Sequence, residues 1–198
     1  SPRASFVSFL FSMLKILEKV IPLKNEDVQE SLKCLQNINK KISSNNLTDN
    51  NPALKLAEWL TDIPIIYYPY GLESSAIRFK NSLQENSKMH VIAEDVVESC
   101  HNGVVSWENE SNLKPILIEG KNDYIKTKER WEILKEYFKS KSIDYYEIMT
   151  EGNSILTKIV NLVYLFDYVS IYRGVLSEID PSPVKSIDFI KNRIEEMK

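Results

Sequence analysis

Apolar residues recur every three or four positions along several stretches of the chain, and this spacing predicts helices. Residues 26–42 give the clearest case, because Leu32, Leu35 and Ile38 would share one face. Pro22 is expected to end the first helix, since its ring cannot continue the hydrogen-bond ladder. The helices expected from this pattern cover residues 3–20, 26–42, 53–60, 74–87, 125–140, 155–176 and 183–197.

Short runs of β-branched and aromatic residues lie between the later helices and predict buried strands. The expected strands cover residues 64–68, 89–93, 115–118 and 145–149. Strands that alternate with helices predict an α/β fold, in which a parallel sheet lies between helices in a three-layer αβα sandwich. In such sheets ligands bind beyond the carboxyl ends of the strands, here the loops after Tyr68, Ala93, Ile118 and Met149.

A polar, asparagine-rich loop at residues 43–51 separates the first helices from the alternating pattern. We therefore expect two parts, a helical arm over residues 1–50 and an α/β domain over residues 51–198. The chain begins with Ser1 rather than Met, which suggests that it is processed, tagged or cut from a longer polypeptide.

Composition narrows the class of protein. Of the 198 residues, 43% are hydrophobic and 27% are charged, which excludes a mostly disordered chain. The formal net charge of −3 argues against a nucleic-acid partner, which normally requires a basic face. The chain has five glycines and no glycine-rich phosphate motif, which weakens a nucleotide-binding interpretation. Cys34 and Cys100 make a poor disulfide framework and are expected to be reduced, as in a cytoplasmic protein.

Two apolar stretches raise the question of a membrane. Residues 6–14 resemble a signal peptide, but charged residues follow and no small-residue cleavage site is present, so a buried helix is favoured. Residues 155–176 are long enough to span a bilayer. They include Lys158, Asp167 and Arg173, which are costly in hydrocarbon. We therefore expect a helix buried in a core or a subunit interface, and no membrane partner.

Metal and acid–base chemistry have few candidates. The chain contains two histidines, His90 at a predicted strand start and His101 in a predicted loop. A zinc site would need further ligands at short spacing, and Cys100 directly beside His101 cannot easily share one ion, so no metal or other cofactor is expected. Considered alone, His101 is either a structural or exposed residue or part of a site. Glu85 is likewise one of 28 acidic residues.

Three spaced blocks change this picture. The first is Ala76-Ile-Arg-Phe-Lys-Asn-Ser-Leu-Gln-Glu-Asn-Ser-Lys88, the second is His101-Asn-Gly-Val-Val-Ser-Trp-Glu108, and the third is Asp180-Pro-Ser-Pro-Val184 with Ile187-Asp-Phe-Ile-Lys191. In order and spacing they resemble the signature blocks of the archaeal and bacterial bifunctional phosphoglucose/phosphomannose isomerases. The opening Pro2-Arg3-Ala4 resembles the linker that follows that family's first domain.

The resemblance implies the second of two sugar isomerase (SIS) domains, each a parallel sheet between helices. It also implies a phosphorylated hexose substrate, an N-terminal SIS domain of the same protein as partner, and a homodimer. In the family, the first domain carries the hydroxyl-rich loop that holds the sugar phosphate. The nearest candidates here are Ser74 and Ser75, whose hydroxyls would hold an anion at a helix start or simply cap the helix. Gly103 stands where the family commonly has Glu.

Residue roles follow from the same resemblance. Glu85 matches the base that transfers a proton between C2 and C1 of the sugar. His101 matches the group that opens the sugar ring, and Lys191 matches the cation that stabilises developing charge. His101 and Lys191 would act in their own subunit's site or in the neighbour's. Arg78 would bind substrate, support the helix of Glu85 or form a surface salt bridge.

The resemblance thus implies an isomerase that interconverts glucose 6-phosphate with fructose 6-phosphate through an enediol, and it leaves open mannose 6-phosphate as a further substrate. Two alternatives stay open: a non-catalytic SIS module that binds a phosphosugar and regulates a partner, and a structural dimerisation domain built on residues 155–176. The pair of Glu85 and His101 favours the enzyme, because a sensor needs neither a base nor a ring-opening acid.

Overall fold

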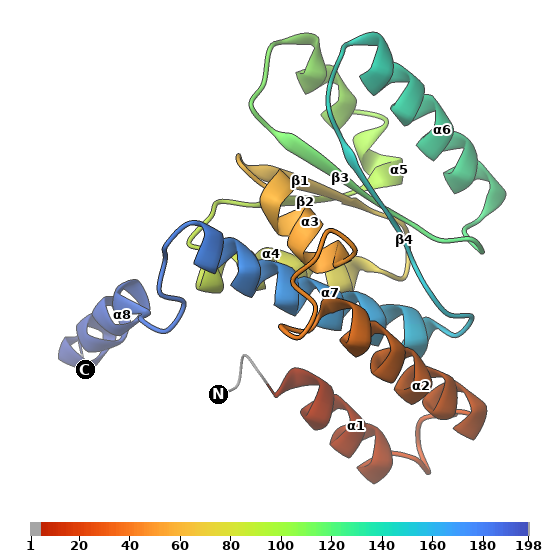
Figure 1. The fold of residues 1–198 in the computed structure, drawn as a ribbon, viewed down its shortest axis with the longest axis vertical. Helices are drawn as coiled ribbons and strands as arrows, with labels where there is room; N and C mark the ends of the chain where they lie inside the picture. Colours follow the sequence, from red (N-terminus) through yellow and green to blue (C-terminus); the bar gives the residue numbers. More distant parts are fainter. Residues whose placement is uncertain (1–4, 198) are drawn as a thin grey trace.

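The computed structural model describes residues 5–197, which fold around one parallel sheet (Figure 1). The strands are β1 (Pro64–Tyr68), β2 (Ile92–Asp95), β3 (Lys114–Glu119) and β4 (Tyr146–Met149). The helices are α1 (Phe6–Ile16), α2 (Asn25–Ile42), α3 (Pro52–Trp59), α4 (Glu73–Asn86), α5 (Val96–Ser99), the 3-10 helix η2 (Gly103–Glu108), α6 (Ile125–Ser140), α7 (Ile155–Leu176) and α8 (Lys185–Glu196). The expected start of the first helix at residue 3 lies outside the described residues.

The four strands lie in the order β2-β1-β3-β4, and every pair is parallel. Parallel neighbours need crossover connections, which the helices between the strands supply. Helices α3, α4 and α7 cover one face of the sheet, and α5 and α6 cover the other (Figure 1). The α/β fold with three layers that the sequence predicts is confirmed.

One sheet carries two cores, because successive side chains on a strand point to opposite faces. On β1, Ile66 lies in the core shared with α4 and α7, whereas Ile65 and Tyr67 lie in the core shared with α6. On β3, Ile116 lies in the first of these cores and Leu117 in the second. These central strands are covered on both faces, which explains why their sequences are apolar almost throughout.

Helix α7 is the centre of the larger core. It packs against α2, α3 and α4. Its length and composition would allow it to cross a membrane, but half of its most apolar window is buried inside the protein, as expected for a core helix. Ile38 and Ile42 of α2 lie in the same core. Helix α2 of the predicted arm therefore packs on the domain predicted to follow it, and the boundary between the two parts stays a prediction.

Strand β2 differs from its predicted bounds. It begins at Ile92 rather than Met89, because the chain turns at Lys88, whose φ is 56°, and residues 89–91 form a connection. His90 therefore precedes the strand instead of starting it. The strand continues through Asp95, a polar residue outside the apolar run on which the prediction rested.

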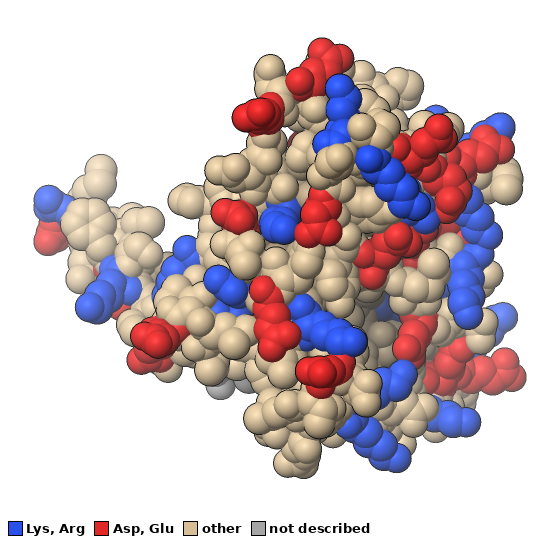
Figure 2. Space-filling view, turned by 45° about the horizontal axis from the view of Figure 1, so that its top comes forward, with Lys and Arg blue, Asp and Glu red and all other residues tan. Residues whose placement is uncertain are grey.

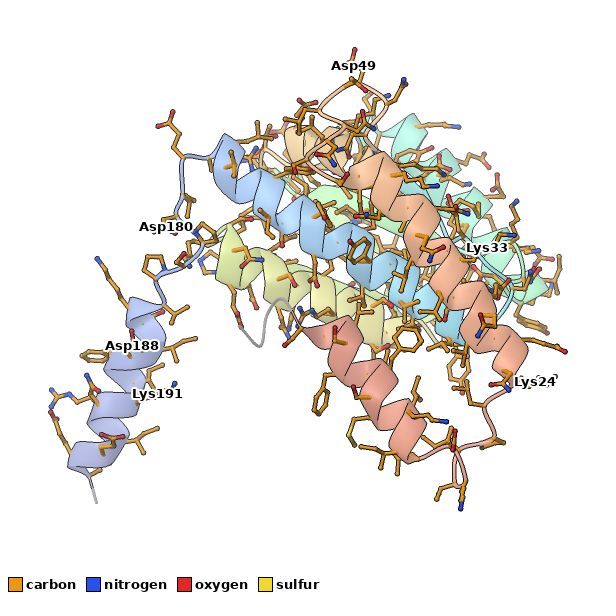
Figure 3. The ribbon with its side chains drawn as sticks, turned by 60° about the horizontal axis from the view of Figure 1, so that its bottom comes forward. Lys24, Lys33, Asp49, Asp180, Asp188 and Lys191 are labelled. Carbon is orange, nitrogen blue, oxygen red and sulfur yellow. The ribbon has the colours of Figure 1, made fainter. Side chains whose placement is uncertain are left out.

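The first and last helices bury none of their described residues. Helix α1 ends at Ile16, well before Pro22, because the main-chain nitrogens of Val20 and Ile21 donate to the Leu17 oxygen and turn the chain earlier. Helix α8 projects away from the sheet and its covering helices (Figures 1 and 3). In Figure 2, acidic and basic side chains are interspersed over the face that is drawn.

Candidate active site

Glu85 lies in the last turn of α4, and its neighbours hold that turn against α7. Asn86 Nδ2 donates to Ser170 Oγ at 2.8 Å, and Ser87 Oγ donates to the Ser170 main-chain oxygen at 2.7 Å. Gly174 approaches the main-chain oxygen of Asn86 so closely that a Cβ atom there would lie 2.9 Å from it. Asn86 and Ser87 are buried, while Glu85 is half-buried. The carboxylate therefore sits on a firmly packed helix end.

Arg78, on the same helix, is engaged within the protein. Its Nε donates to Asp167 Oδ1 at 3.2 Å, and its Nη2 donates to Asp167 Oδ2 at 3.1 Å. Ser82 Oγ also donates to Asp167 Oδ1, at 2.8 Å. The guanidinium carbon lies 5.1 Å from the centroid of the Phe6 ring in α1. A bidentate pair of this kind fixes geometry as well as adding energy, so Arg78 joins α4 to α7.

The surface beside Glu85 is hollowed. A cleft of about 420 Å³ is lined by Gln84, Glu85 and Lys88 from the end of α4 and by residues 183–187, which lead into α8. Lys88 Nζ joins the two sides, because it donates to the Pro183 main-chain oxygen at 2.8 Å. Lys191 lies one helical turn beyond this cleft on α8 and is exposed (Figure 3).

His101 lies in a turn after α5. Asp95 caps α5, since its Oδ1 accepts hydrogen bonds from the main-chain nitrogens of Val97 at 2.8 Å and Glu98 at 3.2 Å. Asn102 Nδ2 then donates to Glu98 Oε1 at 2.7 Å. The side chain of His101 is exposed, on a turn whose neighbouring residues are held by these bonds.

The rest of the His101 block is anchored in the core. Trp107 is buried, and its Nε1 donates to the Tyr67 hydroxyl of β1 at 2.9 Å. Burial raises the pKa of Tyr67 to about 12, so the hydroxyl stays protonated at neutral pH. Gly103 fills a narrow space, because a Cβ atom there would lie 2.7 Å from both Glu94 Oε2 and Ser99 Oγ. The space at this position is thus too small for a side chain unless its neighbours move, which is consistent with Gly103 in place of the Glu that is common in the family.

Ser74 and Ser75 lie in the first turn of α4, beyond the carboxyl end of β1. Leu72 is the N-cap residue, so neither serine caps the helix. Ser74 is exposed, whereas Ser75 is fully buried and its Oγ has no hydrogen-bond partner among residues 5–197. A buried hydroxyl without a partner is unusual, and this one lies where the helix dipole favours an anion.

The structure does not bring all these candidates into one pocket. Glu85 and Arg78 belong to α4, on the face of the sheet covered by α7, whereas His101 follows α5 on the opposite face. Ser74 lies in the first turn of α4 and Glu85 in its last turn, roughly 17 Å apart at the helical rise per residue. Of the candidates outside α4, Lys191 lies on α8, whose first residues line the cleft of Glu85.

Two residues that shape the site were not among the sequence candidates. Asp167 fixes Arg78, and Tyr67 fixes the His101 block through Trp107. Asp167 carries a usable signal, because a carboxylate within an apolar helix needs a partner when it is removed from water. Tyr67 carries none, since an aromatic residue in a central strand predicts packing rather than a specific hydrogen bond.

The sequence matches one family over most of its length. Residues 49–194 match the profile of the bacterial phospho-glucose isomerase C-terminal SIS domain. The bifunctional phosphoglucose/phosphomannose isomerase of Caldicellulosiruptor bescii is 30% identical over 207 residues, which cover 100% of this chain and 60% of that relative. The enzyme of the same name from Aquifex aeolicus is 28% identical over 188 residues, which cover 93% of this chain and 58% of that relative. The chain thus spans about three fifths of the length of these curated relatives.

Solved structures share the fold at lower identity. A glucose-6-phosphate isomerase-like protein from Thermus thermophilus has a TM-score of 0.65 at 18% identity, over 79% of this chain and 52% of that one. The C-terminal domain of glucosamine-fructose-6-phosphate aminotransferase from Francisella tularensis has a TM-score of 0.56 at 14% identity, over 81% and 49%. The family resemblance inferred from the three sequence blocks is confirmed: the chain belongs to the bacterial phospho-glucose isomerase C-terminal SIS domain family.

Proposed function

We propose that this chain supplies the proton-transfer base of an isomerase that interconverts glucose 6-phosphate and mannose 6-phosphate with fructose 6-phosphate. The observation that carries the proposal is Glu85, a half-buried carboxylate on a firmly packed helix end beside an open cleft. Aldose–ketose isomerisation needs one carboxylate within reach of two adjacent carbons. The names of the curated relatives support hexose 6-phosphates as the substrates.

In this mechanism Glu85 accepts the proton from C2 of the open-chain aldose. The electrons of that C–H bond form the C1–C2 double bond, and the π electrons of the C1 carbonyl move onto its oxygen, which takes a proton from solvent to give the enediol. The protonated Glu85 then donates its proton to C1, where the electrons of the double bond form the new C–H bond, while the C2 hydroxyl gives its proton to solvent and becomes the ketone. Lys191 stabilises the negative charge that develops on the sugar oxygens. Arg78 acts as a positioning residue, because its pair with Asp167 holds the helix of Glu85.

His101 opens the ring by protonating the ring oxygen as its bond to C1 breaks, while the C1 hydroxyl gives its proton to solvent and becomes the aldehyde oxygen. Because His101 and Glu85 lie on opposite faces of one sheet, we propose that each His101 acts in the site of a neighbouring copy, within a homodimer. The buried hydroxyl of Ser75 and the exposed one of Ser74 stay proposed anion contacts. The main phosphate contacts are assigned to a preceding SIS domain, as the greater length of the relatives supports.

Glu85→Gln in the full-length enzyme tests the central assignment. The substitution keeps the size and hydrogen-bonding shape of the side chain but removes the base, so turnover should fall by about 10²–10⁴. Exchange of the C2 proton with deuterated solvent measures enolisation directly. Glu58→Gln, an exposed carboxylate on α3, is the matched control and should exchange at the wild-type rate. Near wild-type exchange in Glu85→Gln would remove Glu85 from the mechanism.

His101→Ala separates ring opening from enolisation. This variant should turn over the cyclic sugar slowly but recover part of its rate when an open-chain substrate is supplied. Glu85→Gln should show no such recovery, because its defect lies after the ring has opened. Equal slowing of both substrate forms by His101→Ala would contradict the ring-opening role.

A further inference from the structure

Helix α8 carries an apolar stripe that nothing in the described chain covers. Ile187, Ile190 and Ile194 recur at spacings of three and four and therefore share one face. Their side chains are 38%, 57% and 53% exposed, and no residue of α8 is buried. We call these three residues the α8 stripe.

Helix α1 carries a second stripe of the same kind. Phe9, Met13 and Ile16 share one face of the helix and are 66%, 38% and 73% exposed. We call these three residues the α1 stripe. Contiguous exposed apolar patches on soluble proteins normally mark sites of interaction, so two exposed stripes call for a partner surface.

The two stripes belong to the part of the molecule where the described chain begins. Phe6 and Val7 of α1 line one cavity of about 590 Å³ together with Pro181 and Ser182, which precede α8. The first turn of α1 and the segment that precedes α8 are therefore neighbours, and from there α8 projects away from the body while α1 runs in another direction (Figures 1 and 3). The first described residues of the chain thus lie close to the segment from which α8 begins.

The curated relatives are longer than this chain, and their extra length indicates the size of a preceding domain. The chain covers 60% and 58% of the two relatives described above, and the matched family profile is that of a C-terminal domain. The unmatched part, about two fifths of each relative, therefore precedes the matched part and is large enough for a domain of its own.

We infer that the α8 stripe and the α1 stripe form the docking surface for a preceding domain of the same polypeptide. A tethered domain has an effective concentration in the millimolar range for a short linker, so modest apolar contacts suffice to hold it. A second copy bound through these two stripes alone would lose its full translational and rotational freedom, a cost that the tethered domain does not meet. The docking surface does not depend on which residue is the catalytic base.

Amide hydrogen exchange on the natural full-length protein tests whether the preceding domain docks on these stripes. An amphipathic helix of this length is only marginally stable in water without a partner, so an undocked α8 would exchange rapidly. We expect the α8 amides of the wild-type protein to exchange at least about tenfold more slowly than those of Ile190→Asp. Burial of the new carboxylate is costly, so this variant should not dock, and its α8 should lose protection. Ile190→Ala, which introduces no charge, should lower the protection in the same direction but by less.

Asn192→Asp is the matched control. It adds the same charge on the opposite face of α8 and should leave the protection unchanged. Glu85→Gln should also leave it unchanged, so failure of the docking surface and failure of the proposed base are distinguishable. Rapid exchange of α8 in the wild-type protein would overturn the inference. Protection that disappears on dilution, together with a halving of the mass in light scattering, would also overturn it, by assigning the stripes to a second copy.

Discussion

At the scale of single residues, the contact between Gly174 and Asn86 links the packing of the fold to the candidate base. Gly174 has no side chain, and so α7 lies directly against the backbone that follows Glu85. Gly174→Ala would place a methyl group 2.9 Å from the Asn86 main-chain oxygen, which cannot rotate away. The two helices would have to separate, and Glu85 would move with α4.

We expect Gly174→Ala to lower the free energy of unfolding by about 1–2 kcal/mol, because the cost of overpacking exceeds the gain in helix propensity. Urea denaturation measures this difference. Val175→Ala, at the next position and 64% exposed, should change stability by less than about 0.5 kcal/mol. Wild-type stability in Gly174→Ala would show that α4 and α7 tolerate a wider spacing.

At the residue level, the sequence allowed the family to be recognised from local motifs, but it did not reveal contacts that join distant positions. The motif around Glu85 was recognisable because its residues lie within one helix. The hydrogen bond from Trp107 to Tyr67 joins a 3-10 helix to a central strand, and no local pattern predicts it. Arg78 had three possible roles in the sequence, and its partner Asp167 lies 89 residues away on α7, where no local pattern indicates it.

At the scale of elements, a single carboxylate fastens α2 to the start of α7. Glu30 Oε2 accepts hydrogen bonds from Ser154 N at 3.0 Å and from Thr157 Oγ1 at 2.8 Å. Its Oε1 accepts from Asn153 N at 3.0 Å and from Asn153 Nδ2 at 2.7 Å. These donors, led by the Ser154 main-chain nitrogen, lower the pKa of Glu30 from 4.5 to about 2.

A carboxyl group whose pKa is lowered by folding stabilises the native state at pH values above its unfolded pKa, and this contribution is lost as the pH falls through the folded value. Glu30→Gln should therefore lower the urea midpoint at pH 7, and the gap to the wild type should narrow as the pH falls from about 4.5 toward 2. Glu136→Gln, an exposed carboxylate on α6, should leave the midpoint almost unchanged at every pH. A gap that stays constant with pH would contradict the role of the charge.

Prediction of the elements depended on how strongly each one is buried. The central strands β1 and β3 are covered on both faces, and their apolar runs predicted them nearly to the residue. Strand β2 pairs with β1 alone, so its carboxyl half carries Glu94 and Asp95, and the apolar pattern placed it too early. Neither short helix has a periodic apolar pattern, because α5 begins at the local N-cap Asp95 and η2 carries Trp107 into the core through a tertiary contact.

At the scale of the whole molecule, the candidate site is divided among parts that one copy of the chain does not bring together. We expect residues 1–198 alone to turn over little or no sugar phosphate, because much of the binding energy of the transition state comes from contacts to the remote phosphate. Conversion of glucose 6-phosphate to fructose 6-phosphate, compared with that of the full-length enzyme, measures this. Equal rates from both proteins would place the phosphate site within these residues.

The central position of α7 also has a consequence for synthesis. Helices α2, α3 and α4 all pack on α7, yet α7 follows every strand of the sheet along the chain. A ribosome therefore releases three amphipathic helices and a set of parallel strands before the helix that covers them has been translated. Such nascent chains expose apolar surface and unpaired strand edges, the conditions under which aggregation and chaperone capture occur. Because α7 is translated late, the apolar faces of α2, α3 and α4 stay exposed to solvent for a long part of every round of translation.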